Sequence, residues 1–128
     1  MSNAIQKLME PRSIAVIGAS TDPKKTAGRP IAYLQKHHFK GKIYPVNPRV
    51  AEIAGLKCYP DIASLPETPD VAIIMVGTDK ALSAVQELSQ RGTPAAIVLT
   101  SGFAEHGLEG LKKQEELILA AGAMRILG

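Results

Sequence analysis

Five short apolar segments, evenly spaced along the chain, restrict the fold more than any other feature of the sequence. They are rich in Ile, Val and Ala and cover residues 13–17, 42–46, 71–76, 95–99 and 123–127. Continuous apolar runs, unlike alternating ones, are typical of strands that are buried on both faces. Their starts lie 24 to 29 residues apart, which leaves room for one helix between successive strands.

The intervals between these segments carry helical signals. Pro30 is suited to the first turn of a helix, and Gly41 follows the apolar positions of that helix. A second helix is predicted from residues 78–79 to Gly92, and a third over 108–118. Strands that alternate with helices form right-handed βαβ units, which place helices on both faces of one sheet. We therefore predict an α/β fold: a Rossmann-like, doubly wound parallel sheet of five strands in the order 3-2-1-4-5.

Three weaker predictions concern the remaining segments. Residues 4–9 are expected to form a short helix, which Pro11 ends. Pro45 lacks an N–H group, so the second strand should pair incompletely at its end. Residues 52–69 are the least regular part of the chain, with one helical turn expected over 61–65.

Length and composition restrict the class of protein. The 128 residues form one domain, and the chain stops where the fifth strand ends, so we expect a fragment of a longer protein. Cys58 is the only cysteine, which excludes an internal disulfide and fits a reducing compartment. No apolar run approaches the ~20 residues that cross a bilayer. Aromatic residues make up 4% with no Trp, which argues against a stacking platform for nucleic acid. We expect a cytoplasmic domain that binds neither membranes nor nucleic acids.

Positive charge is concentrated in one segment. Seven basic residues and one acid lie between Asp22 and Arg49, a net charge of +6, whereas the rest of the chain carries −3. Such a segment indicates a local anionic partner, for example a phosphorylated ligand, although a solvated basic face has the same composition.

The loop after the first strand differs from a dinucleotide-binding turn. The G-x-G-x-x-G pattern would need glycine at three positions, but only Gly18 is present, and Ser20 and Pro23 occupy the other two. The loop is also long, and it contains Lys24 and Lys25. Backbone donors and cations in such a loop can hold a pyrophosphate, but the loop is not the usual turn for a nicotinamide cofactor.

The end of the second strand gives a further indication. NAD sites place an acidic residue there to bind the ribose hydroxyls, whereas this chain has Asn47, Pro48 and Arg49. An amide beside an arginine suits a phosphorylated ribose, so NADP or a 3′-phosphorylated nucleotide is favoured over NAD.

Candidates for catalysis are few. His37 and His38 lie near the end of a predicted helix, where a positive imidazole complements the helix dipole. Cys58 has the features of a buried, inert thiol. Glu105 and His106 follow the fourth strand, but no nucleophile or metal-ligand spacing surrounds them. We therefore assign no catalytic residue and no metal.

Three segments together resemble a known family. Residues 13–20, 44–48 and 101–105 each lie at a predicted strand end, and together they resemble the N-terminal CoA-binding domain of NDP-forming acyl-CoA synthetases. This is the type of the ADP-forming acetate–CoA ligases, which are related to the α subunit of succinyl-CoA synthetase. The resemblance extends from about Pro11 to Gly128.

The resemblance implies that CoA lies across four loops at one edge of the sheet. Residues 18–20 would hold the pyrophosphate, 46–48 would line the adenosine side, 76–78 would flank the cofactor and 101–103 would face the pantetheine arm. The residues carried over are Gly18, Ala19, Ser20, Val46, Asn47, Pro48, Val76, Gly77, Thr78, Ser101, Gly102 and Phe103.

Charge adds four cations to this expected site. Lys25 and Arg29 lie in or next to the first loop and are expected to contact phosphates. Arg49 or Lys42 is expected near the 3′-phosphate.

The leading hypothesis is therefore a CoA or acyl-CoA binding domain of an NDP-forming acyl-CoA synthetase, non-catalytic by itself. Full enzymes of the family act through a phosphohistidine on a second domain and an ATP-grasp unit, so further ligase domains or subunits are the expected partners. His106 does not match the position of the phosphohistidine. Two alternatives stay open: a stand-alone CoA-binding module, and an NADP-binding oxidoreductase domain.

Overall fold

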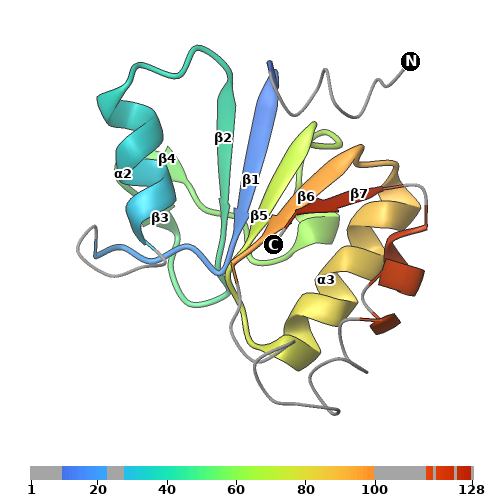
Figure 1. Ribbon diagram of the computed structural model, residues 1–128. Coiled ribbons are helices and arrows are strands. Elements are labelled where there is room, and N and C mark those ends of the chain that lie inside the picture. The colour runs from blue at the N-terminus through green and yellow to red at the C-terminus, as the bar shows by residue number, and fades with distance from the viewer. Residues whose placement is uncertain (1–9, 23–27, 100–114, 117, 123, 128) are drawn as a thin grey trace.

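A parallel sheet of five strands forms the centre of the computed structural model, which describes residues 10–22, 28–99, 115–116, 118–122 and 124–127 (Figure 1). The strands run side by side in the order β2-β1-β5-β6-β7. Their bounds are β1 Ser13–Ile17, β2 Lys42–Val46, β5 Val71–Ile74, β6 Ala95–Val98 and β7 Arg125–Leu127. The α/β class and the parallel five-stranded sheet are confirmed, and each strand falls within its predicted apolar segment.

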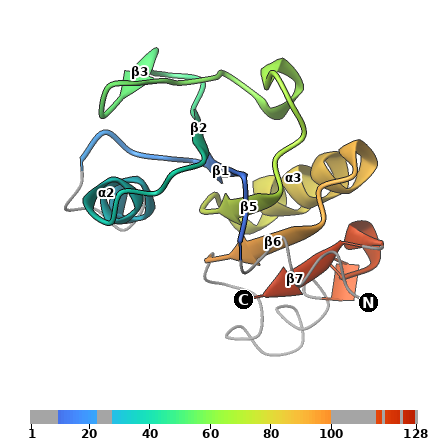
Figure 2. The same cartoon turned by 90° about the horizontal axis from the view of Figure 1, so that it is seen from above.

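Burial on both faces explains why these segments are continuously apolar. All five residues of β1 are buried, and they alternate between two core clusters. Ile14 and Val16 pack in the cluster that contains Ile31 of helix α2. Ala15 and Ile17 pack in the cluster that contains four residues of helix α3. Figure 2 shows these two helices on opposite sides of the sheet.

Helix α2, Arg29–Lys36, has Pro30 in its first turn as predicted. It ends earlier than expected, with His37 as its C-cap and His38 at a φ of 56°. Gly41 is therefore not the helix stop. It is needed there for space, since a Cβ at residue 41 would lie 2.5 Å from the carbonyl oxygen of Arg12.

Helix α3, Thr78–Arg91, begins after Gly77 and ends at Gly92. Gly92 is a left-handed C-cap with a φ of 90°, and the N–H of Thr93 donates to the carbonyl of Leu88 at 3.0 Å. The predicted stop is confirmed, whereas the expected side-chain cap at residue 78 or 79 is replaced by Gly77.

The third strand position differs from the prediction. The segment Val71–Ile74 was expected at the edge beside β2, but it pairs with β1 on the other side. The edge position is held instead by Tyr59, which forms a single parallel bridge with Val46. If the bridge at Tyr59 is counted as the third strand, the sheet follows the predicted order 3-2-1-4-5. In that count β5 is the fourth strand, β6 is the fifth, and β7 lies beyond β6.

Pro45 does not weaken the pairing of β2 with β1. The register runs through Ile17 and Val46, and the N–H of Gly18 donates to the carbonyl of Val46 at 2.9 Å. Tyr59 donates to the carbonyl of Pro45, so residue 45 directs its backbone away from β1. The missing N–H of Pro45 therefore faces the sheet edge, and the expectation of incomplete pairing was wrong.

Residues 52–69 contain a hairpin that the sequence analysis missed. Strands β3, Glu52–Ile53, and β4, Leu56–Lys57, pair across a turn in which Ala54 and Gly55 both have positive φ. The predicted helical turn is confirmed as a short 3-10 helix, Ile62–Ser64. Its cap is Asp61, whose carboxylate accepts the N–H of Ser64 at 2.9 Å.

Arg91, the last residue of α3, fixes the chain that follows this turn. Its guanidinium donates to the carbonyl of Ile62 at 2.9 Å and to those of Leu65 and Glu67 at 3.3 Å. Residues 62–67 are therefore attached to the end of the helix.

The C-terminal helix is described in part, with residues 115–116 and 118–121 helical before Gly122. The predicted helix over 4–9 and most of 108–118 lie outside the described residues. Among the helices that the structure describes, none has the length and apolarity needed to cross a bilayer.

Candidate functional site

A cleft of about 490 Å³ opens where the carboxyl ends of β1, β2 and β5 meet. Four of the residues that line it were predicted as site residues from the sequence: Gly18, Val46, Pro48 and Val76. Its far wall is formed by residues 60–62 and by one side of α3, from Lys80 to Glu87. In open parallel sheets, this edge is where ligands bind.

Gly18 lines the cleft where the chain leaves β1. Its φ is +87°, and a Cβ built on it would lie 2.7 Å from Cγ1 of Val76 and 3.2 Å from the carbonyl oxygen of Met75. Side chains are strained in this conformation, and here the space is also filled. Glycine at position 18 therefore lets the end of β1 pass directly against the end of β5.

Asn47 holds the first loop against the second. Its Nδ2 donates to the carbonyl of Ala19 at 2.9 Å, and its Oδ1 accepts the N–H of Arg49 at 2.8 Å. Its own N–H donates to the carbonyl of Tyr59 at 2.9 Å. The side-chain amide and the backbone N–H of Asn47 together brace the backbone of three segments.

Ser20 and Ala19 continue the first loop toward α2. Ala19 is completely buried, and the hydroxyl of Ser20 accepts the N–H of Asp22 at 3.1 Å. Ser20 also lines a smaller cavity of about 300 Å³, together with Gly28 and Ile31 of the α2 region. The loop therefore lies between two cavities, with its backbone at the sheet edge.

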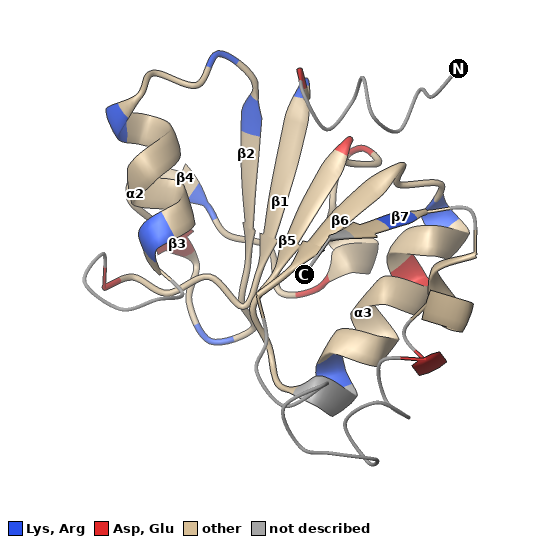
Figure 3. Cartoon of the chain, viewed as in Figure 1, with Lys and Arg blue, Asp and Glu red and all other residues tan. Residues whose placement is uncertain are grey.

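The basic segment is divided between the two ends of the sheet (Figure 3). Arg49 follows the carboxyl end of β2 and is exposed, and Arg29 begins α2. Lys42, in contrast, begins β2. At ~3.3 Å per residue it lies about 13 Å from Val46. The structure thus does not bring Lys42 to the cleft, and the expectation of a role for Lys42 there was wrong.

Lys80 is a cation of the cleft that the sequence analysis missed. It lies in the first turn of α3 and lines the cleft near Val76. A signal was present, because a lysine two residues after a helix start at a carboxyl edge faces any ligand bound there. The N-terminus of this 14-residue helix also favours negative charge.

Four predicted site residues lie outside the described part of the chain: Lys25, Ser101, Gly102 and Phe103. Glu105 and His106, to which the sequence assigned no role, lie outside it as well. Gly77 is exposed, with nothing within 4 Å of a Cβ built on it. Thr78 begins α3, and the structure describes its backbone.

Neither Cys58 nor His37 or His38, the histidines that the structure describes, lines the cleft. Cys58 is buried, and burial raises the pKa of its thiol, whose Sγ lies 3.6 Å from the carbonyl oxygen of Asn47. His37 is exposed and lies 4.3 Å, between ring centroids, from Tyr33 at the end of α2. The prediction of a buried Cys58 is confirmed.

Comparison with known proteins decides what kind of domain carries this cleft. The model of a family described as a CoA binding domain matches residues 12–128. The chain belongs to this CoA-binding family.

Relatives of this CoA-binding domain are much longer proteins. It is 40% identical over 120 residues to acetate–CoA ligase (ADP-forming) II subunit alpha of Pyrococcus furiosus, covering 92% of this chain and 26% of that protein. It is 40% identical over 117 residues to a trans-feruloyl-CoA synthase of an unknown prokaryote, covering 91% and 16%. The chain spans between 16% and 28% of the length of these two relatives and of five further curated relatives.

Solved structures include both long and short relatives of the CoA-binding domain. The apo form of a dinucleotide-forming acetyl-coenzyme A synthetase 1 from Ca. Korarchaeum cryptofilum superposes with a TM-score of 0.90 at 42% identity, over 97% of this chain and 27% of that one. A conserved hypothetical protein from Pyrococcus furiosus has a TM-score of 0.72 at 28% identity, over 91% of this chain and 93% of its own.

The described residues of the CoA-binding domain fit the chemistry of CoA. The cleft has the volume of a small-molecule site, and apolar side chains such as Val46, Ile62 and Val76 suit a flat adenine ring. The close approach at Gly18 leaves backbone at the edge, and Lys80 gives the cleft a positive charge that suits a phosphate.

Proposed function

We propose that this chain binds CoA or acyl-CoA along the carboxyl edge of its sheet and forms the CoA site of an ADP-forming acyl-CoA synthetase. The observation that carries this proposal is the junction of Gly18 and Asn47, which joins the ends of three strands beside an apolar cleft. Membership of the CoA-binding family supports the same ligand.

The adenosine half of CoA would occupy the cleft, with its adenine between Pro48 and Ile62 and near Val76. Backbone groups of residues 18–20, with Lys25 and Arg29, would bind the diphosphate. The 3′-phosphate would be bound by Arg49, and by Lys80 in place of Lys42. Residues 77–78 and 101–103 would flank the pantetheine arm.

CoA, when bound, supplies the thiol that carries the acyl group. The work of this chain is binding and orientation, because the described part of the cleft holds a lysine, two carboxylates and a serine but no histidine or cysteine. Acyl transfer and nucleotide chemistry would be carried out by further ligase and ATP-grasp domains or subunits. We place the protein in the cytoplasm, since a single free cysteine fits a reducing compartment.

A stand-alone CoA-binding module is the second candidate. It is favoured by the Pyrococcus furiosus hypothetical protein, of whose chain this domain covers 93%. The two candidates are separated by removing this domain from the full-length protein. Loss of acyl-CoA synthetase activity would favour the synthetase over the stand-alone module. The NADP hypothesis has no support from the family match.

Ligand-dependent melting tests the proposal directly. The chain is heated with CoA, acetyl-CoA, dephospho-CoA, NADP or NAD, and its melting temperature is compared. CoA at 100 times its Kd should stabilise the fold by about 2.7 kcal/mol. Dephospho-CoA should stabilise less at equal concentration, because it lacks the phosphate assigned to Arg49 and Lys80. Stabilisation by NADP with none from CoA would overturn the assignment.

A further inference from the structure

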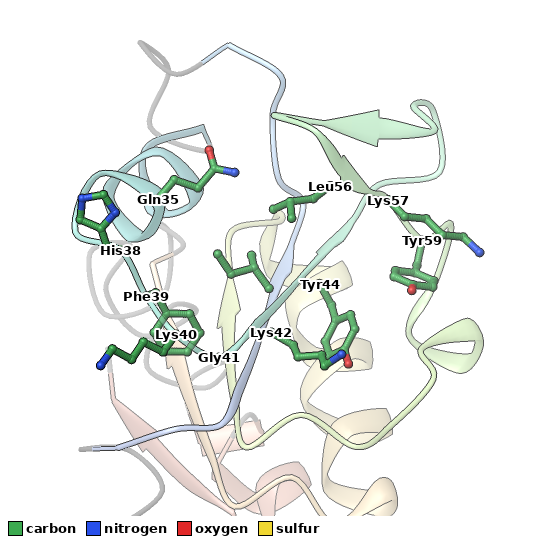
Figure 4. Close-up of a pocket in the computed structure, with 11 residues that line it drawn as sticks. Gln35, His38, Phe39, Lys40, Gly41, Lys42, Tyr44, Leu56, Lys57 and Tyr59 are labelled. Carbon is green, nitrogen blue, oxygen red and sulfur yellow. The ribbon is translucent and has the colours of Figure 1, made fainter.

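A second and larger cavity, of about 670 Å³, lies at the other end of β2 (Figure 4). It is a trough between the end of α2 and the β3–β4 hairpin, with the first residues of β2 along its length. Phe39, Tyr44, Leu56 and Tyr59 provide apolar and aromatic surface in it. The trough shares no lining residue with the CoA cleft.

The charge of this trough has one sign. Lys40, Lys42 and Lys57 line it together with His38, and no aspartate or glutamate is among its lining residues in the described part of the chain. The three lysines are exposed, and Figure 4 shows that they come from separate positions around the trough. Two carboxylates lie near the trough lining: Glu67 accepts the hydroxyl hydrogen of Tyr44, and Glu52 is the register partner of Lys57 in the hairpin.

The backbone along the trough belongs to a strand edge. β2 is the outermost strand of the five-stranded sheet, and only near its carboxyl end does Tyr59 pair with it. Tyr59 bonds to the carbonyl of Pro45 and to the N–H of Asn47, so odd-numbered residues face outward. By the same alternation, Ile43 directs its N–H and carbonyl into the trough. β4 lies near β2 but has no ladder with it, because its strand partner is β3.

We propose that this trough docks an acidic, extended segment of a partner polypeptide, which adds a short strand to β2. The backbone of the segment would pair with Ile43, as Tyr59 already pairs farther along the same edge. Its carboxylates would lie near Lys40, Lys42 and Lys57, and its apolar side chains would contact Phe39 and Leu56. This proposal is independent of the ligand bound in the cleft.

The probe for the test is a labelled eight-residue peptide of alternating Glu and Val. Fluorescence anisotropy with the 128-residue chain should give saturable binding that weakens as salt is raised. The double variant Lys42→Gln/Lys57→Gln should bind about fivefold or more weakly, because two charge contacts are lost. The matched control, Lys80→Gln in the cleft, should bind the peptide like the original chain. Melting curves of both variants verify that the exposed substitutions leave the fold intact.

Two further arms separate strand addition from simple attraction. Two further peptides of the same charge carry N-methyl groups on alternate residues, one on the odd-numbered and one on the even-numbered residues. The peptide whose methyl groups block the hydrogen bond to Ile43 should bind weakly. Citrate, a small polyanion, should not displace the original peptide at equal charge concentration, and CoA should not displace it either. The proposal is overturned by absence of peptide binding, by equal binding of the double variant, by equal binding of both methylated peptides, or by saturable competition from citrate.

Discussion

The two ends of β2 are built for different kinds of contact. At the carboxyl end, the backbone is enclosed: Val46 accepts from Gly18, Asn47 is bonded to three segments, and Tyr59 covers the edge. At the amino end, the same edge is open, and lysines and aromatic side chains surround it. One strand of five residues thus has a rigid end suited to a small molecule and an accessible end suited to another chain.

Replacing Gly18 tests the rigid end with the largest expected effect. Gly18→Ala combines a positive φ with a 2.7 Å contact to Val76, so the free energy of unfolding should fall by about 3 kcal/mol. CoA affinity should fall as well. Urea denaturation and calorimetric titration measure the two quantities.

Gly92→Ala is the matched control for Gly18→Ala. Its φ of +90° is similar, but nothing lies within 4 Å of its Cβ, so only backbone strain of about 1 kcal/mol is expected, with unchanged CoA affinity. Equal losses of stability in the two variants would show that the close approach at Gly18 is unimportant.

Asn47 tests whether the bracing of the loops matters for binding. Asn47→Ala should lower the free energy of unfolding by about 1–2 kcal/mol, because the buried Ala19 carbonyl loses its donor. Asn47→Asp keeps the acceptor for Arg49 but not the donor for Ala19, so it should not restore CoA affinity. Recovery of affinity in Asn47→Asp, measured by titration calorimetry, would assign the role to the Arg49 turn alone.

The smallest expected effect is on stability at alkaline pH, and it comes from Tyr44, which lines the trough at the open end of β2. Burial, and then the hydrogen bond and negative charge of Glu67, raise the pKa of Tyr44 above its ordinary value of 10.0. The folded chain therefore holds the neutral phenol, and this contribution to stability is complete below pH 10 and lost as the pH rises beyond it.

The measurement for Tyr44 is the difference in unfolding free energy between the original chain and Tyr44→Phe from pH 8 to pH 11. This difference should be constant up to about pH 10. Above that pH the original chain should lose stability relative to Tyr44→Phe. A difference that does not change with pH would contradict the assigned pKa direction.

The sequence alone was sufficient for the features that depend on local chemistry. Continuous apolar runs predicted the five strands because both faces of the sheet are covered, and Gly92 was identified from its capping preference. One helical turn was also expected over 61–65, where the structure has the 3-10 helix Ile62–Ser64. The lining residues Gly18, Val46, Pro48 and Val76 were implied by the resemblance to the CoA-binding domain of acyl-CoA synthetases.

Features that depend on tertiary pairing could not be predicted in the same way. The third edge position is taken by one bridge at Tyr59, which has no periodicity to detect, and the hairpin turn at Ala54 and Gly55 lacks an asparagine or aspartate. Lys42 was misplaced because charge was counted along the chain, whereas a strand carries its two ends to opposite edges of the sheet. Lys80 was missed for the converse reason, since it is distant in sequence from the basic segment.

An open strand edge has a consequence for how copies of this protein behave toward one another. Unpaired backbone at the rim of a sheet can template the addition of an identical chain, which leads to aggregation. Here Lys40, Lys42 and Lys57 surround the unpaired stretch, so two such rims brought together would repel each other. The charges that attract an acidic peptide thus also oppose self-association. Neutralising these lysines should make concentrated solutions of the protein turbid.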